Sequence, residues 1–511
     1  DNCTAAGYNA LGSNTTGSEN TAVGHHSLVS NTTASNNTAV GYKALEANTT
    51  GTENTATGWQ ALKSNTTGNY NSAFGLGTLQ TNTTGSYNTA TGQQSLYSNT
   101  TASNNVGVGY RALFANTTGD RNTGLGTNAL NANTTGSYNT AVGYGALLVN
   151  TTGTNNTAVG YNALDANTTA SYNTAVGDDA LGSTTTGDAN TAIGYHAMAA
   201  NTTGDNNNAL GYGALDDNTD GDYNNAFGQN ALGSNTTGDK NGAFGQDALA
   251  ANTTGGQNNA FGNSALAANT DGTQNTAFGH DALAANTTAN ENTAVGHEAL
   301  KVSTTGTQNT AIGRVALWKV TTGNANSGIG REAGRDITTG GYNSCLGRSA
   351  LEQCTTGSNN TGIGANSGRA GQPGGTVSTG DNIICCGNND IANAYIKVSW
   401  TVTSDARDKT DITNFTPGLS WINKLRPVTY RWDERINYSE DQSVVPDGTH
   451  KKSRLNLGFL AQEELEVEKE HGYGNDNDDM LVTDLSGDGK QYSMKYERLV
   501  PVLVNAVKEL S

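Results

Sequence analysis

Two residues in the last quarter of the chain could carry covalent chemistry, Ser404 and Lys409. A serine hydroxyl is a weak nucleophile that needs a nearby base. A lysine can act as that base only if burial lowers its pKa enough to leave the amine neutral. A tight turn from Asp405 to Asp408 would fold Lys409 back onto Ser404, with Asp405 and Arg407 holding the turn as an ion pair. Serine and lysine at this separation are common by chance, so the assignment depends on its surroundings.

Residue types that bind metals are too scattered to form a site. The chain has five cysteines and no CxxC pair, which argues against both a disulfide framework and a zinc site. They are Cys3, Cys345, Cys354, Cys385 and Cys386. His280 and His297 lie 17 residues apart, but no HxH phrase accompanies them. We therefore expect no metal and no cofactor.

Most of the chain is a repeat. The phrase NTAVGYKALEANTTGTE, which begins at Asn37, returns in similar form every 17 residues. From Cys3 to the copy that opens at Asn360 there are 22 copies without an insertion. Counted from the opening residue, position 5 is always Gly, position 9 is nearly always Leu, and positions 3 and 8 are mostly Ala. Position 4 is usually Val, Ile, Leu or Phe, and positions 12 to 15 read NTTG.

Disorder, helix and solenoid are the three structures that such a period could indicate. A disordered tract has no reason to keep its register through every copy. A helix would let its apolar face wander, because 17 is not a whole number of helical turns, and the Gly and NTT residues would break it. A parallel β-solenoid fits the period. We predict two short strands per coil, around TAVGY and ALxxN, joined by Gly and Asn turns.

An unbroken period places like residues on top of one another. The Asn residues of positions 1 and 12 should form two amide ladders along the axis, and the Thr hydroxyls parallel ones. Gly at position 5 should mark a close approach that a Cβ would block. The apolar content of one coil is small, so we expect Ala and Gly faces to pack against other chains in a homotrimer.

These repeats resemble the head repeats of trimeric autotransporter adhesins, whose NSxAxG-type phrase forms a left-handed parallel β-roll. They resemble still more the NTAxGxxAL repeats predicted for phage tail-fibre proteins. The resemblance implies a left-handed, trimeric all-β roll over residues 3–376.

Aromatic side chains recur at positions 6 and 17 of the repeat. Exposed rings could stack on sugars, but covering the neighbouring coil is the favoured interpretation. Members of the two columns include Tyr8, Tyr42, Trp59, Tyr70, Tyr87, Tyr144 and Tyr161. The NTT phrase is also an acceptor for N-glycosylation in a eukaryotic secretory pathway, and here it recurs because the turn recurs.

The period ends after the copy at Asn360, and the composition then changes. Residues 377–403 indicate β-structure that closes the roll, and residues 404–511 a small α+β domain. Within that domain we predict a short helix at 418–425, a strand at 426–432, a strand running into a helix at 455–462, and a helix from Lys495 with Leu499, Leu503, Ala506 and Leu510 at helical spacing.

Four ordered motifs in residues 404–511 resemble the intramolecular chaperone of endosialidases and related phage fibres, the peptidase S74 family. They are SDARDKTDI (404–412), LRPVTYRW (425–432), GFLAQEE (458–464) and YERLVPVLVNAVKEL (496–510). The resemblance implies a domain that trimerises the fibre, guides its folding and then cuts itself off. It also implies that Ser404 and Lys409, in an SDxRxK phrase, make the cut.

Charge and hydropathy exclude several classes of partner. The formal net charge is −18 with no basic block, which disfavours nucleic-acid binding. No apolar run is long enough for a membrane-spanning helix, so we expect no membrane insertion. The chain begins with Asp rather than Met, which leaves a preceding signal or anchor open. A glycan-cleaving enzyme is disfavoured, because a strict repeat makes ladders rather than converging carboxylates.

The sequence therefore favours a trimeric tail fibre on a virus particle, outside the cell, whose only enzymatic act is a single self-cleavage. Its partners would be two further copies of itself, a host-surface receptor such as a glycan, and other tail proteins of the virion. The alternative is an adhesin or filament on a cell surface that uses the same roll.

Overall fold

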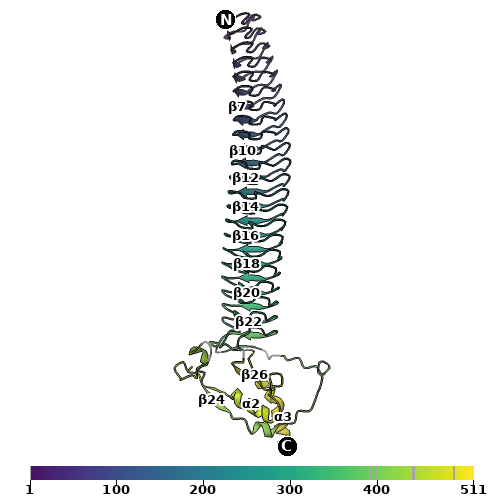
Figure 1. Ribbon diagram of the computed structural model, residues 1–511, viewed down its shortest axis with the longest axis vertical. Helices are drawn as coiled ribbons and strands as arrows, with labels where there is room; N and C mark the ends of the chain where they lie inside the picture. Colours follow the sequence, from purple (N-terminus) through teal and green to yellow (C-terminus); the bar gives the residue numbers. More distant parts are fainter. Residues whose placement is uncertain (1, 374, 392, 398–400, 440–442, 487–488) are drawn as a thin grey trace. The chain divides into compact units, whose positions relative to one another are not determined.

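A computed structural model describes the chain except for residues 1, 374, 392, 398–400, 440–442 and 487–488. The chain divides into two compact units, Asp1–Glu291 and Asn292–Ser511, and each is described by itself. In both units the repeats form coils that stack through parallel strands, as Figure 1 shows. The predicted fold class, a parallel β-solenoid followed by a small α+β region, is confirmed.

The first unit consists of coils whose strands pair with the strand one period along the chain. Thr21 lies opposite Thr38, and Val23 opposite Val40, so the register is the sequence period itself. The strands are β1 Thr4–Ala6, β2 Thr21–Val23, β3 Thr38–Val40, β4 Thr55–Thr57, β5 Ser72–Phe74, β6 Thr89–Thr91, β7 Val106–Val108, β8 Thr123–Leu125, β9 Thr140–Val142, β10 Thr157–Val159, β11 Thr174–Val176, β12 Thr191–Ile193, β13 Asn208–Leu210, β14 Asn225–Phe227, β15 Gly242–Phe244, β16 Asn259–Phe261 and β17 Thr276–Phe278.

The second unit continues the same coil and then changes architecture. Its solenoid strands are β18 Thr293–Val295, β19 Thr310–Ile312, β20 Ser327–Ile329, β21 Ser344–Leu346, β22 Thr361–Ile363 and β23 Ile384–Cys386. Strand β23 pairs in parallel with β22, Thr361 opposite Ile384, although 23 residues rather than 17 separate the two. Strand pairing therefore extends one coil beyond the last copy of the repeat, past an insertion that lengthens the connection.

Only one of the two strands predicted for each coil is present among the described coils. The ALxxN segment is a run of turns, and its Leu is in the left-handed region, with φ of 52° at Leu45. The backbone still bonds to the next coil, because Leu45 N–H donates to Ala61 O at 3.0 Å. Alternating backbone conformations curl this segment around the leucine, which is why the predicted second strand is wrong.

The interior of each coil is filled by small side chains, one leucine and two asparagines. Ala39, Ala44 and Leu45 have no exposed surface, and neither do Asn37 and Asn48. Alanines at positions 3 and 8 thus lie inside their own chain. The expectation that Ala faces pack against other chains is wrong, because a coil this narrow has room for nothing larger than a methyl group at those positions.

Both amide ladders are present as predicted. Asn54 Nδ2 donates to Asn37 Oδ1 at 3.1 Å and to Gly68 O at 2.9 Å, and Asn65 Nδ2 donates to Asn48 Oδ1 at 2.8 Å. A buried amide costs free energy unless its donors and acceptors are paired, and here each coil supplies partners for the next. The ladders therefore specify the 17-residue register.

Gly at position 5 is required by the stacking. Gly41 has φ of +138°, and a Cβ added there would lie 2.3 Å from the carbonyl oxygen of Gly58 in the next coil. Thr hydroxyls at position 13 bond to the backbone rather than to one another, for example Thr49 Oγ1 to Thr66 O at 3.1 Å.

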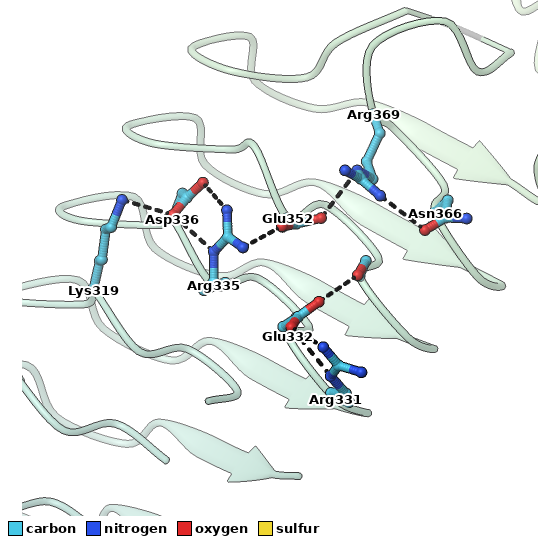
Figure 2. Close-up of polar contacts among 9 residues, drawn as sticks. Lys319, Arg331, Glu332, Arg335, Asp336, Glu352, Asn366 and Arg369 are labelled. Atoms are coloured by element: carbon cyan, nitrogen blue, oxygen red, sulfur yellow. Dashed lines mark hydrogen bonds and ion pairs between the residues drawn. The ribbon is translucent and has the colours of Figure 1, made fainter. Parts of the chain in front are cut away.

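Charged side chains link the last coils of the repeat, as Figure 2 shows. Glu352, whose side chain is 5% exposed, lies between Arg335 and Arg369, with a nitrogen–oxygen distance of 2.9 Å to Arg369. Asp336 accepts hydrogen bonds from Arg335 and forms an ion pair with Lys319 at 2.8 Å. Opposite charges on successive coils therefore support the register where the repeat ends.

The C-terminal part of the second unit is a small α+β module. Its helices and strands are η1 Ala406–Asp408, α1 Leu419–Ile422, β24 Val428–Tyr430, η2 Arg435–Asn437, β25 Asn456–Gly458, α2 Ala461–Glu470, β26 Thr483–Leu485, β27 Tyr492–Met494, η3 Tyr496–Arg498 and α3 Leu499–Leu510. Strands β24 and β25 pair antiparallel, as do β26 and β27. All the helices and strands predicted for this module are present.

A core centred on Trp421 holds the module together. Val467, Val482, Leu499 and Val502 pack with it. Helix α3 buries Leu499, Val502 and Ala506, and leaves the predicted Leu503 and Leu510 exposed.

Candidate self-cleavage site

The turn that carries Ser404 and Lys409 is built by its own polar residues. Asp405 caps the 3₁₀ turn η1 by accepting from the backbone N–H of Arg407 at 2.9 Å. The Arg407 guanidinium returns to the same carboxylate, with Nη2 2.6 Å from Oδ2. This ion pair lowers the pKa of Asp405. The predicted role of Asp405 and Arg407 in holding the turn agrees with these contacts.

The turn brings the serine and the lysine together. Lys409 N–H donates to Ala406 O at 3.3 Å, which closes the turn, and Lys409 Nζ donates to Ser404 Oγ at 2.6 Å. A nucleophile and its base need this separation. For catalysis the proton must move the other way, from Oγ to a neutral Nζ, and that requires removing water from the amine. Both side chains are exposed in the single chain.

Two buried glutamates on helix α2 organise the module that follows, and the sequence gave no sign of them. Glu464 accepts from Trp421 Nε1 at 2.8 Å, and burial raises the pKa of Glu464 against the lowering effect of that bond. Glu468 accepts from three consecutive backbone N–H groups, those of Leu481, Val482 and Thr483, at 3.0, 2.7 and 2.6 Å. These partners are distant in sequence, so local patterns could not have revealed the role of either residue.

Metal-ligating and thiol residues do not converge. Among the described residues no group of three or more His, Cys, Asp and Glu side chains could hold a metal ion. Cys345, Cys354 and Cys385 are buried, and burial raises the pKa of each, to about 11 for Cys354. Protonated, buried thiols of this kind are poor nucleophiles and poor ligands.

The aromatic columns of the repeat stack on themselves. Tyr42 stacks on Trp59, Tyr144 on Tyr161, and Tyr70 on Tyr87, with ring centroids 6.2, 5.4 and 4.9 Å apart. Ring faces within a stack are covered by the next ring, so they offer edges rather than faces to a sugar. This agrees with the interpretation that they cover the neighbouring coil.

The NTT asparagines are unavailable as glycan acceptors once the coil has folded. Asn48 and Asn65 are fully buried, and their amide nitrogens donate within the ladder and to the backbone. The phrase therefore serves the turn and the ladder.

The peptidase S74 family, described as chaperone of endosialidase, matches residues 404–473. The match begins at Ser404 and covers Lys409, the Trp421 core and helix α2. Residues 404–473 therefore form an endosialidase-type chaperone domain. Such a domain implies autoproteolytic self-cleavage and acts in trimeric assemblies. No protein of curated function and no solved structure matches the chain. Within the described residues, no helix is both long and apolar enough to cross a membrane.

Proposed function

We propose that the chain is a trimeric tail fibre of a virus particle, which attaches the particle to a host surface and is matured by its own C-terminal chaperone domain. The solenoid supplies a repetitive shaft, and the chaperone domain brings three chains together before the coils close. The observation that carries the proposal is the contact between Lys409 Nζ and Ser404 Oγ at the start of the family match.

The proposed cut is a single acyl transfer. Ser404 Oγ attacks a neighbouring backbone carbonyl while neutral Lys409 accepts the hydroxyl proton. The C–N bond then breaks, the leaving amine takes a proton, and water hydrolyses the ester. Because both side chains are exposed in one chain, assembly has to cover them before the lysine can lose its proton. Cleavage would then follow correct trimer formation.

Three variants test the dyad. Ser404→Ala and Lys409→Ala should each give an uncut chain that still assembles, since folding precedes the cut. Lys409→Arg should also stay uncut, because a guanidinium keeps its proton and cannot act as a base. Arg407→Lys, which keeps a positive charge beside Asp405, is the matched control and should still be cut. Equal cutting in wild type and Lys409→Ala, seen on a denaturing gel, would remove Lys409 from the reaction.

A cell-surface adhesin built from the same repeats is the second candidate. The resemblance of the repeat to adhesin heads favours it, and the chaperone match favours the fibre. Immunogold labelling of virus particles and of host cells would separate the two, since only the fibre should label particle tails.

A further inference from the structure

One face of the first unit carries apolar side chains outward. In each strand the middle residue is buried and the flanking residues point out, as in any strand with one face covered. Val23, Leu125 and Phe278, at position 4, are 38%, 45% and 57% exposed. Because the strands pair in register, these residues form one continuous column. The position-4 column of β2 to β17 consists of Val23, Val40, Thr57, Phe74, Thr91, Val108, Leu125, Val142, Val159, Val176, Ile193, Leu210, Phe227, Phe244, Phe261 and Phe278.

The strand face that carries this column excludes charge. Charged residues occur at positions 6, 7, 10, 11, 14, 16 and 17 of the repeat, but in none of the 22 copies at position 2 or position 4. Position 2, the other outward residue of each strand, is mostly Thr, Ser or Asn. Depletion of charge with retention of apolar and aromatic residues is the signature of an interface core.

The column is also packed along its length. Phe227, Phe244, Phe261 and Phe278 stack in succession, with ring centroids 4.9, 4.5 and 5.8 Å apart. An apolar surface that continues through sixteen coils exceeds what a monomer ordinarily leaves in water. A partner must therefore cover it.

Periodicity identifies the partner. A cover that contacts every coil must repeat with the same rise as the coils, and a second copy of this chain does so. Like coils side by side would bring like residues together, so a charged column could not face its own copies. Asp188, Asp205, Asp222 and Asp239 form such a column at position 16. The uncharged position-4 column has no such penalty.

We propose that the position-4 columns of three copies of this chain face one another, like coil beside like coil, and form the core of the trimer interface. This inference rests on the trimeric fibre proposed above. It places the interface on the outer face of the strands, where side chains of Val, Leu, Ile and Phe meet their counterparts.

Site-specific cross-linking tests the interface. In the full-length chain with Cys3→Ser and Cys386→Ser, the remaining native cysteines are buried. Val159→Cys then places a thiol in the column, and Thr152→Cys, in the exposed turn of the preceding coil, is the matched control. A short bis-maleimide should link two chains through Val159→Cys and none through Thr152→Cys, with light scattering reporting the assembly state of each.

Linkage at Val159→Cys in a trimer supports the inference. A trimer linked only through Thr152→Cys overturns it and leaves the fibre proposal standing. A chain that is monomeric by light scattering overturns both. Changing Val142, Val159 and Val176 together to Lys should dissociate the trimer while the circular dichroism of the coils is retained. An unchanged trimer in that variant would also overturn the inference.

Discussion

The solenoid and the chaperone domain reach a folded state by opposite means. Each coil repeats one set of contacts, so Asn54 does for its coil what Asn37 does for the coil before it. In the chaperone domain each contact occurs once and joins distant segments, as Trp421 joins Glu464. The difference teaches that stacking cannot count coils, because any coil fits the next. A separate domain with unique contacts is needed to align three chains.

The largest effect should come from removing that domain. Deletion of residues 404–511 should leave aggregate or misassembled monomer, because three solenoids would then close without alignment. Yield of soluble trimer, measured by size exclusion with light scattering, is the readout. Ser404→Ala is the control, since it keeps the domain attached throughout. Normal yield of trimer from the truncated chain would show that the repeats align themselves.

Within the solenoid, breaking one ladder should cost more than any surface change. Asn156→Ala removes the donor to Ala170 O at 2.8 Å and the acceptor for Asn173 N–H at 2.9 Å. Two buried groups without partners should destabilise the coil by about 2–4 kcal/mol. Hydrogen exchange should show faster exchange in the neighbouring coils, while the exposed control Thr152→Ala should change nothing. Equal protection in both variants would show that the ladders do not hold the register.

Within the chaperone domain, a single glutamate should matter almost as much. Glu468→Gln weakens the acceptor of three backbone N–H groups and should destabilise the domain by about 2 kcal/mol. Glu466→Gln on the same helix breaks only an exposed ion pair with Lys469 and should cost less than about 0.5 kcal/mol. Tryptophan fluorescence during urea unfolding measures both, and a smaller loss in Glu468→Gln than in Glu466→Gln would contradict the assigned role.

The smallest effect, opposite in sign between the two regions, should appear on acidification. Burial raises the pKa of Asp336, but hydrogen bonds from Arg335 and Lys319 outweigh it, so the net shift is downward. Its contribution is present above about pH 4 and is lost as pH falls. The pKa of Glu464 is raised, chiefly by burial, so its contribution is greatest at low pH and is lost as pH rises.

Hydrogen exchange between pH 6 and pH 4 should therefore show the coil of Asp336 weakening. Urea unfolding of the chaperone domain over the same range should be less destabilised by acid than in Glu464→Gln. Asp336→Asn should remove the first dependence and Glu464→Gln the second. If Asp336→Asn keeps the wild-type acid sensitivity, the ion pairs of that coil do not determine it.

Much of the solenoid was predictable because identical copies must meet identical neighbours. The period alone led to the amide ladders and to the close approach at position 5. It did not reveal that Leu45 is in the left-handed region, since leucine rarely is. Nor did it say which face of TAV points inward, because alternation gives two faces and only the width of the coil decides between Ala39 and Val40.

In the chaperone domain, the motif led to the turn that joins Ser404 and Lys409, because both residues lie within one short segment. Burial of Glu464 and Glu468 could not be predicted. Nothing local distinguishes them from the exposed Glu463 and Glu466 on the same helix, and their partners come from other segments of the fold.

The mass of the purified wild-type assembly, measured by native mass spectrometry, tests most directly whether this chain assembles as a trimer and then cuts itself. We predict three copies of a solenoid fragment that ends near residue 404, together with or separated from the fragment that begins there. A monomer, cut or uncut, would contradict assembly before cleavage.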